Sequence, residues 1–393
     1  MFEPVYGNHL VGNIQTVLGP ISNNDLGITL MHEHILLDQQ ARERRSLKVR
    51  AKKDKFFSKG VPSTFLNDWD KKKLNIDNLS DSMSNRYSIA DNYYLNDLNL
   101  AQMELNNYFS RGGDSVVDLT VRGIGRDPLG LFQISSLTGI NIIMGTGWYV
   151  PDFHPVDMDS RTIGSLVEEL VKEICVGVDS TFIRAGIIGE IGIQDGKLTE
   201  NEIKIVKAVS RASISTGTSI SFHYGGTGRE RFNLLDIIKN EGCPVDRIIL
   251  GHSDLIAGDL DLILELLENG IYIQFDLLGR VGAHLTVEPI DSSNPWPSYL
   301  NTSNTALVSK VLPTLISYGY VDKILLSQDI CTKIQLKKFG GTGYSFILES
   351  LVPHLLEIGI SKEDIETILV KNPRDVLKIK EFNLNLLSKY IQC

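Results

Sequence analysis

The chain has 393 residues, of which 42% are hydrophobic and 22% are charged, a composition typical of a soluble globular protein with a large core. Its net charge of −9 argues against nucleic acid as the main partner, because phosphate contacts need a basic surface. No apolar stretch reaches the roughly 20 residues of a membrane span, and the start of the chain lacks the pattern of a secretory signal. The four cysteines lie far apart without C-x-x-C spacing, so we expect no disulfide framework and a cytoplasmic location.

Short runs rich in Ile, Val and Leu alternate with amphipathic stretches along the chain. Most of the runs are apolar at nearly every position, which is typical of strands in a parallel sheet that helices cover. The predicted strands are residues 26–31, 115–120, 141–145, 185–190, 219–223, 247–252, 272–275 and 323–327. The predicted helices are residues 95–110, 163–175, 199–216, 230–241, 259–269, 304–318 and 346–358. This alternation favours a (β/α)8 TIM barrel, and the lack of a G-x-G-x-x-G turn after the first strand argues against a dinucleotide-binding fold.

Three segments fall outside the alternation, and we expect them to belong to one domain spanning residues 1–393. A small β-hairpin is predicted from residue 13, before the first barrel strand, where it would cover the floor or side of the barrel. Residues 39–90 form a polar insertion after strand one, and its basic run at 42–55 is either a solvated surface or a lid that carries cations to an anionic substrate. Residues 279–304 form a long loop after strand seven, where functional loops of a barrel lie.

The residues that end the predicted strands carry the functional signal. His32 and His34 follow strand one as an H-x-H pair, and an extended segment turns both imidazoles to the same face. Four more ligand-type residues, at the ends of strands four, five, six and eight, are Glu190, His223, His252 and Asp329. Because the carboxyl ends of barrel strands converge on one rim, we expect all six side chains to meet. Four imidazoles and two carboxylates suit Zn²⁺, Mn²⁺, Fe²⁺ or Co²⁺ better than Ca²⁺, and six ligands suit two ions that share a carboxylate.

Each of these residues also has a purely structural explanation. A single histidine at a strand end is commonly a hydrogen-bonded rim residue, and Asp329 would also suit the cap of a following helix. Glu190 is harder to explain in this way, because burying an unpaired carboxylate costs several kcal/mol and no Lys or Arg adjoins it in the strand. The coincidence of six such residues favours a metal centre. The remaining histidines are predicted to be ordinary surface or loop residues: His9, His154, His284 and His354.

The order H-x-H, Glu, His, His, Asp along the strands resembles the phosphotriesterase family of the amidohydrolase superfamily, and most of all its phosphotriesterase-related proteins. The similarity runs over nearly the whole chain, through residues 15–19, 29–34, 185–192, 337–344 and 370–376. The loops at 39–90 and 281–302 are longer than the family pattern. Since such loops shape substrate choice, the resemblance says least about the substrate.

The resemblance implies a role for each candidate ligand. His32, His34 and Asp329 would hold the more buried ion, and Glu190 would bridge it to a more exposed ion on the last two ligands, His223 and His252. Many family members bridge with a carboxylated lysine, whereas this chain has Gly189 at that position and Glu190 after it. The chain therefore resembles the glutamate-bridged branch, which needs no carbon dioxide to assemble its site.

The predicted chemistry is hydrolysis that depends on two divalent metal ions, with zinc favoured. A hydroxide bridging two ions would attack a carbonyl carbon or a phosphorus, and Asp329 would accept its proton and pass it to the leaving group. No G-x-S-x-G elbow is present, so no covalent intermediate is expected. Arg280 and Lys333 are candidates to bind an anionic substrate group, with surface cations as the alternative reading, and Tyr224 is a candidate to line the pocket.

The sequence leaves open which type of bond the protein hydrolyses. The resemblance favours a small N-acylated amine bearing an anion, or a lactone. A phosphorylated sugar lactone and a phosphate ester are the other options. An alternative of a different class is a barrel that binds a small molecule without turning it over. The resemblance also implies a homodimer, and neither nucleic acid nor a membrane is an expected partner.

Overall fold

The computed structural model describes residues 7–40, 71–84, 88–194, 197–226, 228–281, 305–382 and 384–390. The predicted insertion at residues 39–90 lies partly outside the described residues, and its basic run at 42–55 lies wholly outside them. The described part of the insertion contains one short helix, α3 (Leu79–Ser84). Most of the predicted loop at residues 279–304 also lies outside the described residues.

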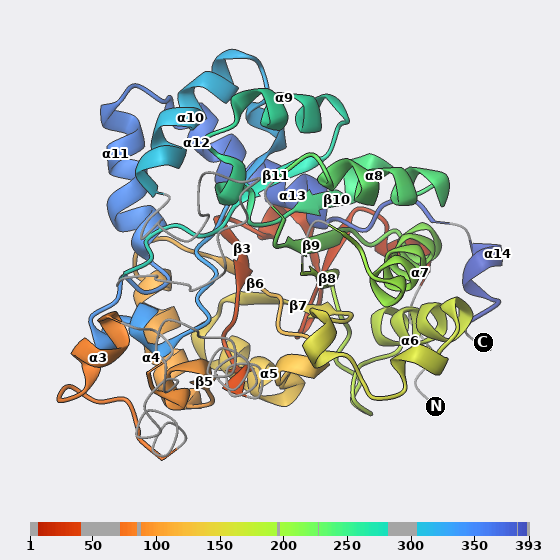
Figure 1. Cartoon of the computed structure of the whole chain (residues 1–393), viewed down its shortest axis with the longest axis horizontal. Coiled ribbons are helices and arrows are strands. Elements are labelled where there is room, and N and C mark those ends of the chain that lie inside the picture. Colours follow the sequence, from red (N-terminus) through yellow and green to blue (C-terminus); the bar gives the residue numbers. More distant parts are fainter. Residues whose placement is uncertain are drawn as a thin grey trace, which may run out of the picture.

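Eight parallel strands form a nearly closed barrel with helices around it, which confirms the predicted TIM barrel (Figure 1). Their order in the sheet is β12-β11-β10-β9-β8-β7-β6-β3, so each strand pairs with its neighbour in sequence among the eight. The bounds are β3 (Thr29–Glu33), β6 (Ser115–Asp118), β7 (Asn141–Thr146), β8 (Ile187–Ile193), β9 (Ile220–Tyr224), β10 (Ile248–Leu250), β11 (Tyr272–Phe275) and β12 (Ile324–Leu326). Every predicted strand has its counterpart in this list.

The helices cover the outer face of the barrel (Figure 1). Six predicted helices correspond to α4 (Leu98–Phe109), α6 (Ile163–Cys175), α7 (Glu200–Thr216), α8 (Arg231–Asn240), α9 (Leu260–Glu268) and α10 (Thr305–Ser317). The helix predicted at 346–358 is divided into a π-helical turn, η12 (Ile347–Leu351), and α11 (Val352–Glu357). The chain then forms α12 (Lys362–Glu366), a second π-helical turn η13 (Thr367–Lys371), α13 (Asn372–Leu377) and α14 (Leu384–Leu387).

The sequence analysis missed α5 (Pro128–Thr138), which lies between the second and third barrel strands. Its apolar residues do not follow one helical face, because Leu129 and Phe132 are exposed while Gly130 is buried. A capping signal was nevertheless present in the sequence. Asp127 caps the helix by accepting a hydrogen bond from the Gly130 amide, and proline follows it at the first helical position.

The floor of the barrel is covered by the predicted hairpin, an antiparallel pair of β1 (Asn13–Thr16) and β2 (Gly19–Ser22). Ile14 of this hairpin is fully buried in a cluster with side chains from the barrel strands, among them Ile143 and Ile249. A second small ribbon pairs β4 (Leu37–Asp38) with β5 (Tyr94–Leu95), and so joins the two ends of the insertion. Among the described residues, the longest apolar helices are too short or too polar to span a bilayer.

Candidate metal centre

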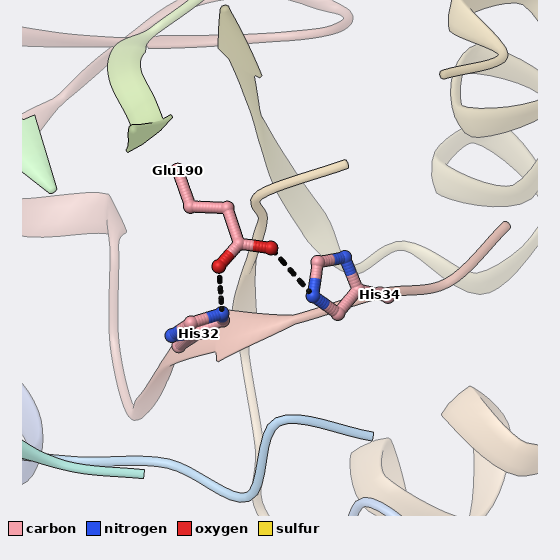
Figure 2. A group of neighbouring side chains, drawn as sticks. All are labelled: His32, His34 and Glu190. Atoms are coloured by element: carbon pink, nitrogen blue, oxygen red, sulfur yellow. Dashed lines mark ion pairs between the residues drawn. The ribbon is translucent and has the colours of Figure 1, made fainter. Parts of the chain in front are cut away.

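The H-x-H pair lies at the carboxyl end of β3, and both imidazoles face the same carboxylate (Figure 2). His32 Nε2 lies 3.4 Å from Glu190 Oε2, and His34 Nε2 lies 3.3 Å from Glu190 Oε1. All three residues are buried. The extended backbone of β3 explains this geometry, because residues two apart in a strand project to the same side.

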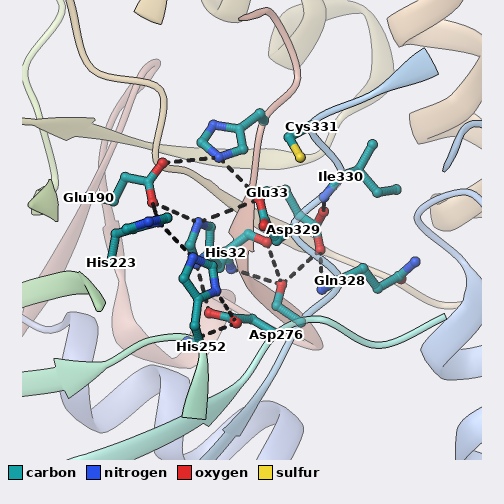
Figure 3. A network of polar contacts seen from close by, with 12 residues as sticks. His32, Glu33, Glu190, His223, His252, Asp276, Gln328, Asp329, Ile330 and Cys331 are labelled. Carbon is teal, nitrogen blue, oxygen red and sulfur yellow. Dashed lines mark hydrogen bonds and ion pairs between the residues drawn. The ribbon is translucent and has the colours of Figure 1, made fainter. Parts of the chain in front are cut away.

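The other three candidate ligands complete the cluster from neighbouring strands (Figure 3). His223 Nδ1 lies 3.1 Å from Glu190 Oε2 and 2.7 Å from His252 Nε2. Asp329 Oδ1 lies 3.3 Å from His34 Nε2. All six side chains named by the sequence analysis therefore meet at one rim.

Glu190 belongs to two groups whose ligand atoms all lie within 4.8 Å of one another. One group contains His32, His34 and Glu190, and the other contains Glu190, His223 and His252. Two groups of three that share a carboxylate have the arrangement needed for two ions with a common bridging ligand.

The backbone of β8 requires glycine immediately before Glu190. The register between β8 and β9 shifts between Ile188 and Ile191, so the strand bulges where Glu190 projects inward. Gly189 there has a φ of +151°, and a Cβ at this position would lie 2.7 Å from the Ser221 carbonyl oxygen. A lysine therefore does not fit at position 189, and Glu190 is the residue of β8 that reaches the cluster.

The sequence analysis missed Asp276, which follows β11 and bridges two of the imidazoles from behind. Its Oδ2 lies 2.8 Å from His32 Nδ1 and its Oδ1 lies 2.7 Å from His252 Nδ1. Gln274 donates a further hydrogen bond to Oδ2. A carboxylate on the far nitrogen fixes the tautomer of an imidazole and leaves its other nitrogen to face a metal. The available signal was the position of this residue. The sequence analysis assigned no ligand to strands two, three and seven, and Asp276 directly follows strand seven.

We expect Asp276→Asn to weaken metal binding by about 10- to 100-fold, the usual cost of losing an outer-shell partner. The amide can accept from one imidazole but cannot act as an acceptor for both. Competition titration with a zinc chelator measures the affinity. Asp375→Asn is a matched control, because the Asp375 carboxylate accepts a hydrogen bond from Tyr272 near the opposite end of the same strand. Unchanged zinc affinity in the Asp276 variant would contradict this role.

The carboxylates of the cluster raise the pKa values of two of its imidazoles. Burial disfavours the charged form of His32, but the carboxylates of Asp276 and Glu190 outweigh burial and hold the pKa of His32 well above its usual value. The pKa of His34 is raised to about 10, because Asp329 and Glu190 outweigh the opposing effect of burial. The field that draws protons to these imidazoles also draws divalent cations, whose binding displaces the protons.

Among the described residues, two buried atoms of the cluster have no hydrogen-bond partner, although each lies at ion-pair distance from another side chain of the cluster. These are Nε2 of His32 and Oε1 of Glu190, both of which point into the centre of the group (Figure 2). Buried polar atoms are normally paired, and an imidazole nitrogen and a carboxylate oxygen are also preferred zinc ligands. The residues present therefore fit divalent metal ions such as zinc.

The three predicted substrate-binding residues have different surroundings. The Arg280 guanidinium forms an ion pair with Asp329 Oδ2 at the edge of the cluster. Lys333 Nζ instead lies 2.8 Å from Asp91, so its charge is already paired by the residue that directly follows the insertion. Tyr224 is buried, and its ring packs against the buried Arg231 guanidinium, with a centroid distance of 4.6 Å.

The histidines predicted to be ordinary lie apart from the cluster wherever they are described. His9, His154 and His354 belong to no potential metal-binding group among the described residues, and His284 lies outside them. His154 does contact Tyr149, since its Nε2 lies 2.8 Å from the Tyr149 carbonyl oxygen. Tyr149, which the sequence analysis did not name, brings its hydroxyl to 3.4 Å from His223 Nδ1 at the rim.

Comparisons with known proteins show what this chain is similar to. The model of the phosphotriesterase family matches residues 12–377. An N-acetyltaurine hydrolase of Dictyostelium discoideum is 34% identical over 374 residues, which cover 94% of this chain and 98% of that protein. A resiniferatoxin-binding protein from Rhodobacter sphaeroides has 30% identity and a TM-score of 0.81, covering 93% of this chain and 95% of that one. A phosphotriesterase homology protein from Escherichia coli, complexed with phosphate in its active site, has 28% identity and a TM-score of 0.68. The match covers 90% of this chain and 99% of that one.

These comparisons confirm the predicted enzyme class, a hydrolase, and the predicted resemblance. The match extends from the hairpin on the barrel floor to α13, and so contains every candidate ligand. The chain therefore belongs to the phosphotriesterase family.

Proposed function

We propose that this protein hydrolyses the amide bond of a small N-acylated amine that carries an anionic group, with N-acetyltaurine as the first substrate to test. The observation that carries the proposal is the Glu190 carboxylate, shared by two groups of potential metal ligands. The names of relatives such as the Dictyostelium discoideum protein support the choice of substrate.

Two divalent ions, with zinc favoured, would be held by the six candidate ligands. His32, His34 and Asp329 would hold one ion, His223 and His252 would hold the other, and Glu190 would bridge them. Such ions, when bound, polarise the acyl oxygen and lower the pKa of a water molecule toward neutrality. The protein supplies their fixed geometry, since Asp276 and Thr120 orient imidazoles by contacts to the nitrogens that face away from the centre.

Asp329 would move the proton in this reaction. Although burial raises its pKa, the charge of Arg280 and the contact with His34 lower the pKa to about 2, so the carboxylate is ionised at neutral pH. An ionised carboxylate beside the reacting centre can take a proton from the attacking water. Because Asp329 is so weak a base, it would pass this proton to the leaving amine and not retain it.

Arg280 would bind the anionic end of the substrate while it holds Asp329. We expect Arg280→Met to raise the KM for N-acetyltaurine by about 10- to 100-fold, the scale of a hydrogen bond to a charged group. The KM for N-acetylpropylamine, which lacks the sulfonate, should rise much less. Since loss of the Asp329 contact will affect both substrates, the ratio of the two kcat/KM values is the measurement. Lys333→Met is the control, and an unchanged ratio in the Arg280 variant would reject this role.

The test of the whole proposal is a hydrolysis screen with metal-reconstituted protein and metal analysis of the same sample. The substrates are N-acetyltaurine, N-acetyl amino acids, simple lactones, sugar-lactone phosphates and phosphate monoesters and diesters. We expect the highest kcat/KM for an anionic N-acyl amine and about two metal ions per chain. Faster turnover of a lactone or phosphate ester would assign the site to that substrate, and the phosphate in the Escherichia coli structure favours including phosphate esters.

A barrel that binds a small molecule without hydrolysing it is the alternative of another class. The relative from Rhodobacter sphaeroides, which is named for binding resiniferatoxin, favours testing it. Tight binding of N-acyl amines by the metal-loaded protein, with no turnover of any compound in the screen, would establish this alternative.

Two further parts of the proposal are a cytoplasmic location and a homodimer. The location is supported by the cysteine spacing, because the four cysteines lie far apart in the sequence without a C-x-x-C pair. Sedimentation of the purified protein at several concentrations tests the dimer.

A further inference from the structure

The middle residue of the H-x-H segment, Glu33, points away from the imidazoles on either side of it and toward the segment that carries Asp329 (Figure 3). Its side chain is fully buried. Glu33 Oε1 accepts a hydrogen bond of 2.9 Å from the Gln328 amide, and Oε2 accepts one of 2.9 Å from the Ile330 amide. One carboxylate thus binds the backbone on both sides of Asp329.

The amide of Asp329 is held by the same strand, because it donates a 3.0 Å hydrogen bond to the His32 carbonyl oxygen. Three consecutive backbone donors, at residues 328, 329 and 330, are therefore tied to His32 and Glu33. Ser327 adds a fourth link, since its hydroxyl accepts from the His32 amide and lies 2.8 Å from Glu33 Oε1. The closing seam of the barrel, between β3 and the end of β12, is built by these contacts.

The backbone of Asp329 needs such support. Its φ is +46°, in the left-handed region that residues other than glycine rarely adopt. A conformation of this kind persists only where the surrounding structure holds it in place, and it sets the direction in which the side chain projects. Both neighbouring amides are fixed by one buried carboxylate, so the orientation of the Asp329 side chain depends on Glu33.

We propose that Glu33 is a positioning residue, which holds the turn at Asp329 so that the Asp329 carboxylate faces the two imidazoles of the H-x-H pair. The inference rests on the proposed role of Asp329 in hydrolysis. The H-x-H segment then has two structural roles. Its two histidines face the metal centre, and the residue between them, which must point the other way in a strand, fixes a ligand from the opposite end of the sequence.

Glu33→Gln tests this arrangement with little change in volume. A carboxylate can accept on both oxygens, whereas an amide has one accepting oxygen and places its NH₂ against a backbone N–H. We expect kcat to fall by about 10- to 100-fold, the scale of an outer-shell loss, with KM nearly unchanged. In the metal-free protein, we expect amide hydrogen exchange at residues 328 and 330 to accelerate at least about tenfold relative to wild type.

Glu104→Gln is the matched control. Glu104 lies on α4, is also buried, and accepts hydrogen bonds from the backbone amides of Lys337 and Lys338, away from the metal centre. It should leave kcat and exchange at residues 328 and 330 unchanged. If Glu33→Gln does not fold, Ser327→Ala removes one contact of the same carboxylate and should give smaller changes in the same direction.

A double variant separates this inference from the proposed function. If Glu33 acts through Asp329, Glu33→Gln should add little to the loss of kcat in an Asp329→Asn background. Full additivity, or unchanged kcat and exchange in folded Glu33→Gln, would overturn the positioning role. Normal turnover in Asp329→Asn alone would instead reject the proposed function of Asp329, while the exchange measurement would still report on the contact to Glu33.

Discussion

Replacing Glu190 with glutamine should remove at least one of the two proposed metal ions and lower kcat by more than about 100-fold, beyond the usual cost of an outer-shell change. The carboxylate belongs to both groups of potential ligands, so its loss affects both ions. A neutral amide also removes the negative charge that now faces the imidazoles of three histidines, His32, His34 and His223. These imidazoles would then surround an amide, which donates hydrogen bonds as well as accepting them.

Metal analysis and initial rates on the same protein sample measure this effect. Glu202→Gln is the control, because Glu202 is also a buried glutamate close in sequence, but it caps α7 by accepting hydrogen bonds from the amides of Thr199 and Gln194. This control should lose thermal stability and keep its metal. The wild-type protein should also lose turnover after treatment with a chelator and regain it with added zinc. If Glu190→Gln retained two ions and full turnover, the shared metal centre would have to be abandoned.

Asp329→Asn should lower kcat by about 10²- to 10⁴-fold, the range for loss of a general acid–base group. Asparagine keeps the shape of the side chain, and its carbonyl oxygen can still face His34 and the centre. What it cannot do is take a proton from water and return it to a leaving amine. We therefore expect the KM for an N-acyl amine to change much less than kcat, and the protein to retain metal.

The measurement needs metal content alongside the rates, because Asp329 is also a candidate ligand. A variant that keeps two ions and loses turnover assigns proton transfer to Asp329. A variant that loses one ion and turnover together would leave Asp329 as a ligand alone. Rates that match those of wild type would reject both roles.

The sequence was sufficient for the barrel because each strand, and each long helix other than α5, has a strong local pattern. The strands are apolar at nearly every position, as burial on both faces requires, and all eight were located within a few residues. The helix α5 was missed because its exposed Leu129 and Phe132 break the expected pattern, and packing against the barrel decided its orientation. The six candidate ligands were found from one geometric rule, that the carboxyl ends of barrel strands converge.

Contacts between residues far apart in sequence could not be predicted in the same way. Lys333 was predicted to meet substrate, but whether its charge is free depends on Asp91, which lies 242 positions away. Asp276 and Glu33 have no motif of their own, since a single acidic residue after a strand or between two histidines is common. Only the folded structure shows that Asp276 lies behind two imidazoles and that Glu33 binds the turn at Asp329.

The sequence by itself therefore determined the architecture, the family and the side chains that could gather at the rim, because periodicity and strand-end position are local properties. The tertiary structure decided which atoms of those side chains face one another, which charges are already paired, and which carboxylates hold the ligands in place. Hydrogen bonds and ion pairs act over about 3 Å, so they depend on the packing of whole strands against each other, which no local pattern specifies.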